Sequence, residues 1–172
     1  MAENLKGIWR ELGIPADYAE QRHLPIQRVA TRLVSIGPAV DDGKTLHMTP
    51  RAARAWRRMR DAAGRDAVEL LPVSGYRSVA RQAHIIRQKL ADGQKIADIL
   101  RLIAAPGCSE HHTGRAIDVG SPGHTDLEEN FERTAEFRWL RRHARRFGFH
   151  LSYPRRNRHG IGYEPWHWCW RG

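Results

Sequence analysis

Long hydrophobic runs, cysteine and lysine are all scarce in this sequence of 172 residues. No stretch approaches the roughly 18 consecutive apolar residues that a membrane span needs, so we expect no span. Only two cysteines are present, Cys108 and Cys169, which argues against a structural zinc site closed by thiolates. A single pair of cysteines is compatible with a disulfide, with two buried thiols or with metal binding.

The beginning of the sequence, "MAENLKGIWRELGIPADYAE", lacks the continuous apolar segment of a secretory signal and contains acidic residues early. The sequence therefore gives no indication of export by the usual signal-dependent route.

Positive charge is abundant: 29 Lys and Arg residues against 19 Asp and Glu residues give a formal net charge of +10, and only four of the basic residues are Lys. Such a charge favours anionic partners. A nucleic-acid-binding protein is one possible class. The Arg-rich run 141–146, however, has no interleaved aromatic side chains on its face and is interpreted as the solvated face of a helix. We therefore expect no specific nucleic-acid partner.

The pattern of elements predicts one α+β domain with a central, mainly antiparallel sheet flanked by helices. Residues 1–48 are expected to form an arm packed on the domain, with one or two short strands, and residues 49–172 the domain itself. Within 115–120, "RAIDVG" is typical of a half-buried, alternating strand. Helices are predicted at 49–64, 78–93, 95–104 and for about a dozen residues from 133, and strands at 67–76, 115–120, 147–154 and 160–170.

Two polar residues flank a glycine in "PGCSEHHTGRAIDVG", where His111 and Asp118 stand on either side of Gly114. A glycine allows the chain to turn sharply, so the imidazole before the turn and the carboxylate after it can converge. Such a pair on its own is more often a local hydrogen bond than a site.

A second pair lies in "GYEPWHWCW", residues 162–170, where His167 follows Glu164 by three. Pro165 cannot donate to a sheet ladder, so we expect a bend that lets both side chains reach one cavity. Two imidazoles and one carboxylate are three ligands of a catalytic zinc site, and a separate Glu can accept a proton from water. Trp168 and Trp170 are expected to pack in the core.

Arg77, in "SGYRS", follows a predicted strand and precedes a helix. A guanidinium fixed there could bind a substrate carboxylate or a developing oxyanion by charged hydrogen bonds. On charge alone, it could equally be a solvated surface residue.

Four motifs occur in order between residues 74 and 170: "SGYRS" followed by Gln82, "SEHHTGRAID", "FGFHLSYP" and "YEPWHW". Together they resemble the zinc D-alanyl-D-alanine carboxypeptidases of the VanY type. The resemblance implies a Hedgehog/DD-peptidase-like fold, one Zn²⁺ per chain, and a peptidoglycan stem peptide or muropeptide as substrate. Residues 1–48 carry none of these motifs.

The resemblance also implies roles for single residues. His111, Asp118 and His167 are similar to the zinc ligands of the family, Glu164 to its general base, and Arg77 to the residue that stabilises the oxyanion or positions substrate. Neighbouring His112 is not expected to be a ligand, because in an extended segment it points the other way. The resemblance also implies substrate-binding roles for Gln82, Ser109 and Trp166. For Cys108 and Cys169, a disulfide and two buried thiols are equally compatible with the sequence.

The expected function is that of a monomeric zinc metallo-carboxypeptidase that releases a C-terminal D-Ala, in the cytoplasm or exported by a non-standard route in a bacterium or phage. An L,D-carboxypeptidase and a phage-type L-Ala-D-Glu endolysin are enzymatic alternatives. A non-enzymatic, zinc-stabilised binding domain is a different class, known among Hedgehog-type domains. The presence of Glu164 beside all three ligands argues against it.

Overall fold

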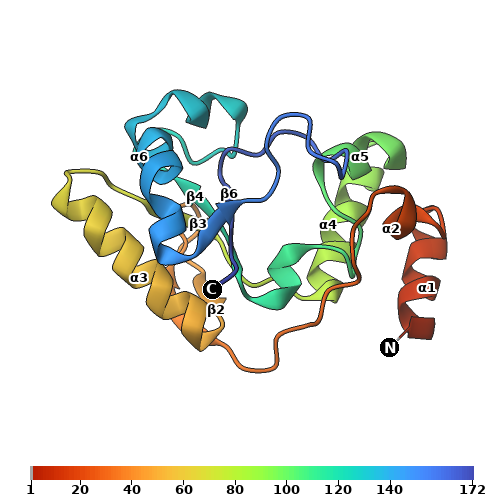
Figure 1. The fold of residues 1–172 in the computed structure, drawn as a ribbon. Coiled ribbons are helices and arrows are strands. Elements are labelled where there is room, and N and C mark those ends of the chain that lie inside the picture. The colour runs from red at the N-terminus through yellow and green to blue at the C-terminus, as the bar shows by residue number, and fades with distance from the viewer. Residues whose placement is uncertain (1) are drawn as a thin grey trace.

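The computed structural model describes residues 2–172, and the strands of this part of the chain form a four-stranded sheet and a separate two-stranded one (Figure 1). Every strand pair is antiparallel. This architecture confirms the predicted α+β class with an antiparallel sheet. The larger sheet has the order β3 (Leu71–Ser74), β4 (Ala116–Gly120), β6 (His167–Trp170) and β5 (Phe149–Leu151), and the smaller one pairs β1 (Val34–Pro38) with β2 (Thr45–Met48).

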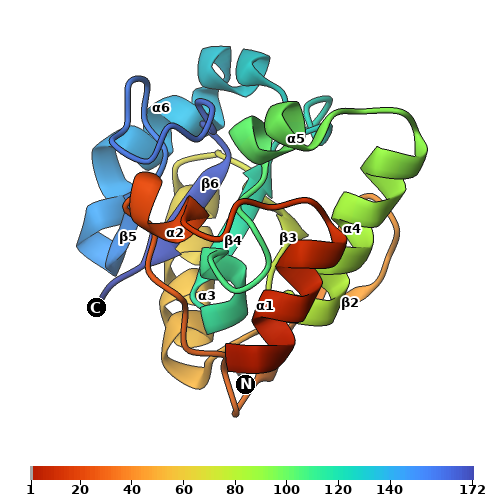
Figure 2. The ribbon, with the colours of Figure 1, turned by 90° about the vertical axis from the view of Figure 1, so that its right-hand side faces the viewer.

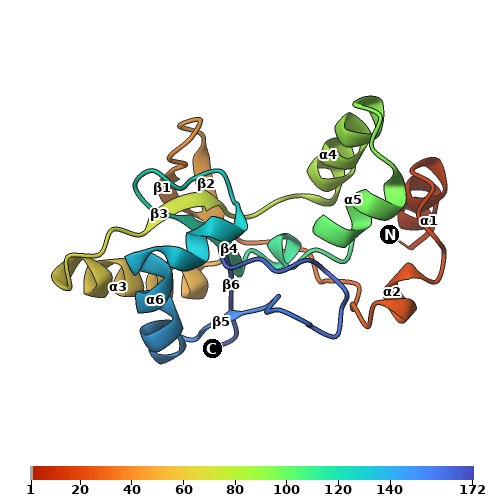
Figure 3. The same ribbon diagram turned by 90° about the horizontal axis from the view of Figure 1, so that it is seen from above.

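Helices lie on both sides of the larger sheet (Figure 3), with α3 and α6 on one side and α4, α5 and α1 on the other. Within residues 2–172, none of the helices combines the length and the apolar composition that a bilayer crossing requires. The α-helices are α1 (Ala2–Glu11), α2 (Tyr18–Gln21), α3 (Pro50–Arg65), α4 (Val79–Ala91), α5 (Ile96–Leu102) and α6 (Ala135–His143), and the 3₁₀ helices are η1 (Glu110–Thr113), η2 (Glu129–Arg133) and η3 (Ala144–Phe147).

Helix α3 forms one wall of the first hydrophobic cluster. Its predicted apolar face is confirmed, since Ala52, Trp56, Met59 and Ala63 are all fully buried. The helix continues through Gly64 to Arg65 instead of ending at the glycine. This cluster also takes in Ile117 and Val119 of β4, Trp168 of β6, Phe149 of β5 and Leu140 of α6.

A second cluster joins the N-terminal helices to α4 and α5 (Figure 2). Trp9 and Tyr18 pack there with Ile86 and Ile99, and the Trp9 indole donates a hydrogen bond to the Pro106 carbonyl at 2.8 Å. The strands expected in residues 1–48 are present as β1 and β2, whereas α1 and α2 were not predicted. The division into an arm and a domain at residue 48 stays a prediction.

The strand β4 differs from the sequence expectation, because all five of its residues are buried instead of alternating. Ile117 and Val119 point into the first cluster, and side chains alternate along a strand, so Ala116 and Asp118 face the opposite side. The strand lies between β3 and β6, with helices over both faces. A carboxylate is therefore buried in the middle of the sheet.

The turn before β4 generates a prediction. Gly114 has φ +62°, and a Cβ there would lie 2.9 Å from Leu33 Cδ2 and 3.2 Å from Ala30 Cβ. Replacing Gly114 with Ala should therefore lower the free energy of unfolding by at least about 1–2 kcal/mol, the cost of a left-handed L-residue. Urea denaturation measures the change.

The matched control is Gly64→Ala, because a Cβ at Gly64, inside α3, meets nothing within 4 Å. Removing that helical glycine should stabilise the protein by about 0.5–1 kcal/mol. Equal effects of the two substitutions would contradict the role given to Gly114.

Candidate metal centre

Three buried side chains, His111, Asp118 and His167, meet at the middle of the larger sheet. The register of β4 and β6 places Asp118 directly opposite His167, and η1 supplies His111. Asp118 Oδ2 lies 3.2 Å from His111 Nε2, and Asp118 Oδ1 lies 3.0 Å from His167 Nδ1. One ligand atom from each residue lies within 4.8 Å of the other two, so this group could hold a metal ion. The predicted convergence is present in the structure.

Each imidazole turns one nitrogen toward Asp118 and the other toward a protein acceptor. His111 Nδ1 lies 2.6 Å from the Gly75 carbonyl oxygen, which can only accept, so Nδ1–H donates and Nε2 is left facing Asp118. His167 is reversed: Nε2 lies 3.0 Å from Glu110 Oε2, and Nδ1 faces Asp118. Histidines that bind metals nearly always have such an outer partner.

The loop after β3 is held against η1 by its backbone. A Cβ on Gly75 would lie 2.8 Å from the His47 carbonyl oxygen, so this close approach requires glycine. Tyr76 N–H donates to that same carbonyl at 2.8 Å, and Arg77 N–H donates to the His111 carbonyl at 3.2 Å. The backbone thereby fixes the position of Arg77 relative to His111.

His112 lies in the 3₁₀ helix η1 instead of the expected extended segment, and its ring is turned to the backbone and away from the metal group. Its Nδ1–H donates to the Arg77 carbonyl at 2.6 Å, and its Nε2 accepts from the Gly107 N–H at 3.0 Å. Burial lowers the pKa of His112 to about 4, against the opposing effect of the hydrogen bond to Arg77. Since both ring nitrogens are occupied, His112 is a structural residue.

Glu164 precedes β6 in a turn, in which the His167 N–H donates to the Glu164 carbonyl at 3.1 Å. Its Oε2 lies 3.6 Å from His167 Nδ1, beside the metal group. Burial raises the pKa of the Glu164 carboxyl to about 8, although the charges of His167 and Arg77 oppose the rise. A carboxyl group with a pKa near neutrality can both accept and release a proton.

Arg77 is held in a fixed position and is not a solvated surface residue. It donates through Nη1 to Gln82 Oε1 at 2.9 Å and through Nη2 to Ser74 Oγ at 3.0 Å. The Gln82 amide is fixed in turn by donating to the Ala104 carbonyl at 2.7 Å. Burial lowers the pKa of Arg77, while the carboxylates of Asp118, 3.8 Å away, and Glu164 oppose this.

Sequence reasoning missed Glu110 and Ser152. Glu110 Oε2 accepts a hydrogen bond from Ser152 Oγ at 2.5 Å and lies 3.0 Å from His167 Nε2. Burial on its own would raise the pKa of Glu110, but the hydrogen bond and charge of His167, with the Ser152 hydroxyl, lower it to about 2. The available signal was the position of Glu110 directly before His111 in "SEHH".

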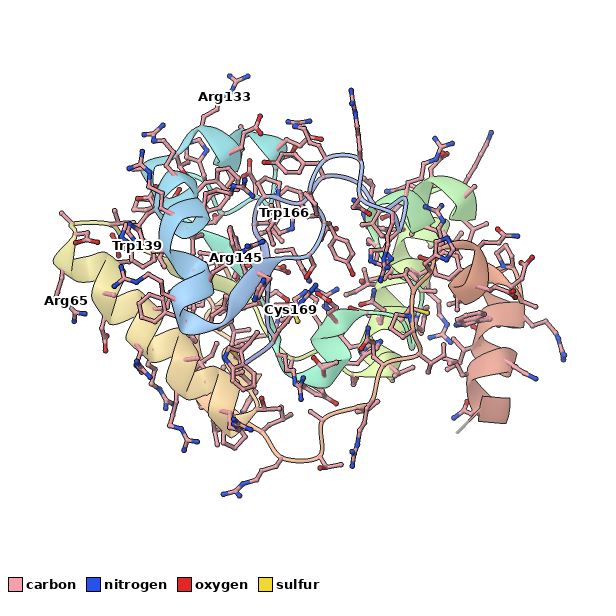
Figure 4. The ribbon with its side chains drawn as sticks, in the orientation of Figure 1. Arg65, Arg133, Trp139, Arg145, Trp166 and Cys169 are labelled. Carbon is pink, nitrogen blue, oxygen red and sulfur yellow. The ribbon has the colours of Figure 1, made fainter. Side chains whose placement is uncertain are left out.

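The remaining predicted residues occupy varied environments. Ser109 is buried and caps η1, with its hydroxyl accepting from the His111 N–H at 3.4 Å. Trp166 is partly buried against the first cluster, beside the loop that leads into β6 (Figure 4). Trp168 packs in the core as expected, whereas Trp170 is only partly buried, with the Arg51 guanidinium over its ring at 5.4 Å.

The possible disulfide is not formed, because Cys108 and Cys169 are both free and buried. Cys108 packs in the second cluster with the N-terminal helices, whereas Cys169 lies on β6 opposite Ala116. Burial raises the pKa of both thiols, that of Cys108 to about 12. Neither cysteine belongs to the metal group.

His112 gives a prediction for the dependence of stability on pH. Its folded pKa of about 4 lies below its ordinary value of 6.5, so between these values the unfolded chain binds a proton that the folded chain does not. The stabilisation is full above pH 6.5 and is lost as the pH falls to 4, and the shift corresponds to about 3 kcal/mol.

The comparison is between wild-type protein and His112→Asn, both kept metal-free with a chelator. The difference in their free energies of unfolding should shrink or reverse by about that amount between pH 7 and pH 4. A difference that stays constant would show that His112 does not titrate as its burial implies.

Residues 45–172 match the model of the family VanY, D-alanyl-D-alanine carboxypeptidase. YodJ of Bacillus subtilis (strain 168) is 40% identical over 121 residues, which cover 67% of this chain and 43% of YodJ. The bifunctional D-Ala-D-Ala dipeptidase and D-Ala-D-Ala carboxypeptidase VanXYC of Enterococcus gallinarum is 32% identical over 132 residues, 74% of this chain and 68% of VanXYC. The chain thus spans less than half the length of YodJ.

Solved structures agree with this match. The LD-carboxypeptidase LdcB superposes with a TM-score of 0.75 at 33% identity, covering 86% of this chain and 72% of LdcB. A mutant of the vancomycin resistance D,D-pentapeptidase VanY in complex with Zn(II) superposes with a TM-score of 0.65 at 29% identity, covering 87% of this chain and 83% of that one. With the family match extending from the second strand to the last residue, the chain belongs to the VanY family of D-alanyl-D-alanine carboxypeptidases.

Proposed function

We propose that this protein is a monomeric zinc metallopeptidase that hydrolyses peptide bonds next to D-amino acids in peptidoglycan stem peptides and releases a C-terminal D-Ala. The observation that carries the proposal is the buried group of His111, Asp118 and His167 with Glu164 beside it. The names of the relatives support the reaction, and the LdcB structure, described as revealing peptidoglycan recognition, supports the substrate class.

The residues fit a catalytic zinc site. Two imidazole nitrogens and one carboxylate oxygen are a set of three ligands that leaves one position open, and both cysteines lie outside the group. The outer nitrogen of each histidine already has an acceptor, so no reorientation is needed. A zinc ion held by His111, Asp118 and His167 would act as a Lewis acid and activate water at neutral pH. The Zn(II) complex of the VanY mutant supports the choice of metal.

In this mechanism Glu164 is the general base. Its carboxylate takes a proton from the attacking water and then returns it to the leaving amine. In the metal-free protein, burial raises the pKa of Glu164 to about 8, and the charges of His167 and Arg77 oppose this rise. A cation bound nearby favours its charged form, and so keeps it ready to accept the proton.

Arg77 stabilises the charge that develops on the scissile carbonyl or binds the terminal carboxylate of the substrate. Ser74 and Gln82 hold its guanidinium before substrate arrives, so little reorganisation is needed during the reaction. Gln82 therefore contributes to the reaction by holding the Arg77 guanidinium in position. Direct contacts of substrate with Gln82, Ser109 and Trp166 are part of this proposal, and Trp166 is the most exposed of the three.

An L,D-carboxypeptidase is the second candidate, favoured by the similarity to LdcB, which is an LD-carboxypeptidase. The two specificities differ in whether the residue before the released D-Ala is a D- or an L-amino acid. A phage-type endolysin would instead cut within the stem peptide, between L-Ala and D-Glu. A binding domain would cut none of these bonds.

Digestion of defined muropeptides, followed by mass spectrometry, tests the function. We expect a pentapeptide stem to lose one D-Ala, and the reaction to stop when a chelator is added and to resume with Zn²⁺. Loss of D-Ala from a tetrapeptide would support the L,D alternative, and cleavage after L-Ala the endolysin. Absence of cleavage by zinc-loaded protein would overturn the proposal.

Glu164→Gln tests the role of the base. We expect kcat to fall by roughly 10²–10⁴-fold, because the amide cannot accept the proton, while the zinc content is unchanged. Steady-state D-Ala release and elemental analysis are the measurements. Glu11→Gln, which alters an exposed carboxylate bound to Arg87, is the matched control and should retain full kcat. Undiminished turnover in Glu164→Gln would exclude Glu164 as the base.

A further inference from the structure

The carboxylate of Glu110 lies directly behind His167, on the side away from Asp118. Its Oε2 is 3.0 Å from His167 Nε2 and accepts a hydrogen bond from Ser152 Oγ at 2.5 Å. Its side chain is only 16% exposed, and that of His167 only 4%. A buried carboxylate with two hydrogen-bonded neighbours has a well-defined position.

This contact joins three segments of the chain. Glu110 begins η1, immediately before His111; Ser152 directly follows β5; and His167 begins β6. The Glu110 carboxylate therefore connects η1, which supplies the His111 imidazole, to β6, which supplies the His167 imidazole. Ion pairing with Arg171 does not explain the arrangement, since its Nη2 is 3.8 Å from Glu110 Oε1 and its side chain is 56% exposed.

A neutral imidazole has one N–H and one lone pair, and only the lone pair can bind a metal. An acceptor at Nε2 keeps the proton on that nitrogen and leaves the lone pair on Nδ1. In His167, Nδ1 is the atom that faces Asp118, at 3.0 Å, and Glu164, at 3.6 Å. The Gly75 carbonyl does the same for His111 from the opposite nitrogen.

We propose that Glu110 is a positioning residue of the metal centre: its carboxylate, held by Ser152, fixes the ring orientation and the Nε2–H tautomer of His167 and thereby presents Nδ1 to the metal. The proposal rests on the proposed function, because it takes His167 as a metal ligand. Glu110 is not one of the three residues of the metal group. It acts on the opposite side of the imidazole from Glu164, so the two carboxylates have separate roles.

The first test compares the Zn²⁺ dissociation constants of wild-type protein, Glu110→Ala and Glu110→Gln, measured by competition with a chromogenic chelator. Loss of such an outer partner typically weakens metal binding about 10–100-fold, which we expect for Glu110→Ala. Glu110→Gln keeps an oxygen that can accept from Nε2–H and should recover most of the affinity. Glu11→Ala removes an exposed carboxylate paired with Arg87 and is the matched control, with unchanged affinity.

The second test reads the tautomer directly, by ¹⁵N NMR of the histidine rings in the zinc-loaded proteins. Wild-type His167 should carry its proton on Nε2, with Nδ1 bound to the metal, and Glu110→Ala should lose the hydrogen-bonded Nε2–H signal. A merely structural role of Glu110 would not change this signal. If Glu110→Ala does not fold, Glu110→Gln and the wild-type spectrum still decide the question.

The outcomes separate the two proposals. Wild-type protein that binds no Zn²⁺ would overturn the proposed function, and this inference with it. Wild-type protein that binds Zn²⁺ while Glu110→Ala binds it equally tightly would overturn this inference alone. So would a wild-type spectrum with the His167 proton on Nδ1.

Discussion

The metal centre depends on how β3 and β6 are aligned with β4 at Asp118. In the sheet, Asp118 of β4 pairs with Ser74 of β3 on one side and with His167 of β6 on the other. Ser74 holds Arg77, and His167 is one of the two imidazoles of the group. A slip of one residue would turn Asp118 toward the hydrophobic cluster and separate it from its partners. The backbone ladder thus brings together Asp118, His167 and, through Ser74, the Arg77 guanidinium.

Burying the carboxylate, the imidazoles and the guanidinium costs free energy. Hydrogen bonds and opposite charges within the site offset this cost. Burial would raise the pKa of Asp118, but the two imidazoles hold it well below its usual range. In the metal-free protein, the carboxylates of Asp118 and Glu110 outweigh the effect of burial and raise the pKa of His167 to about 10. These carboxylates favour the protonated form of His167, and a metal ion competes with that proton for the imidazole lone pair.

Residues on both sides of the start of the family match, at residue 45, support the loop that carries His111. Backbone N–H groups of Gln27, Ala30 and Thr49 donate to the carbonyls of Gly107, His112 and Gly114 at 2.7–2.8 Å. Residues 27–30 and Thr49, on either side of the β1–β2 hairpin, therefore lie alongside the chain around η1. Sequence reasoning identified the fold class, and the local motifs paired His111 with Asp118 and Glu164 with His167 because these residue types form zinc sites. The role of Arg77 came only from the resemblance to the VanY family.

Three features of the structure were not predicted from the sequence: the Ser152–Glu110 hydrogen bond, helix α1 and the separation of the two cysteines. The bond from Ser152 to Glu110 joins residues 42 apart, and no periodicity encodes such a pairing. Helix α1 was missed although Leu5, Ile8, Trp9 and Leu12 have helical spacing, because early Gly and Pro residues suggested an irregular arm. Cys108 and Cys169 each lie close in sequence to a residue of the metal group, which left a disulfide between them open. In the structure both thiols are free, and the two cysteines pack in different parts of the fold.

X-ray absorption spectroscopy of the zinc-loaded protein tests the central claim most directly. We predict that only nitrogen and oxygen atoms bind the zinc ion, with two imidazoles at about 2.0–2.1 Å and further oxygen ligands at about 2.0–2.2 Å. A sulfur ligand at about 2.3 Å, from Cys108 or Cys169, or a shell with a single imidazole, would contradict it.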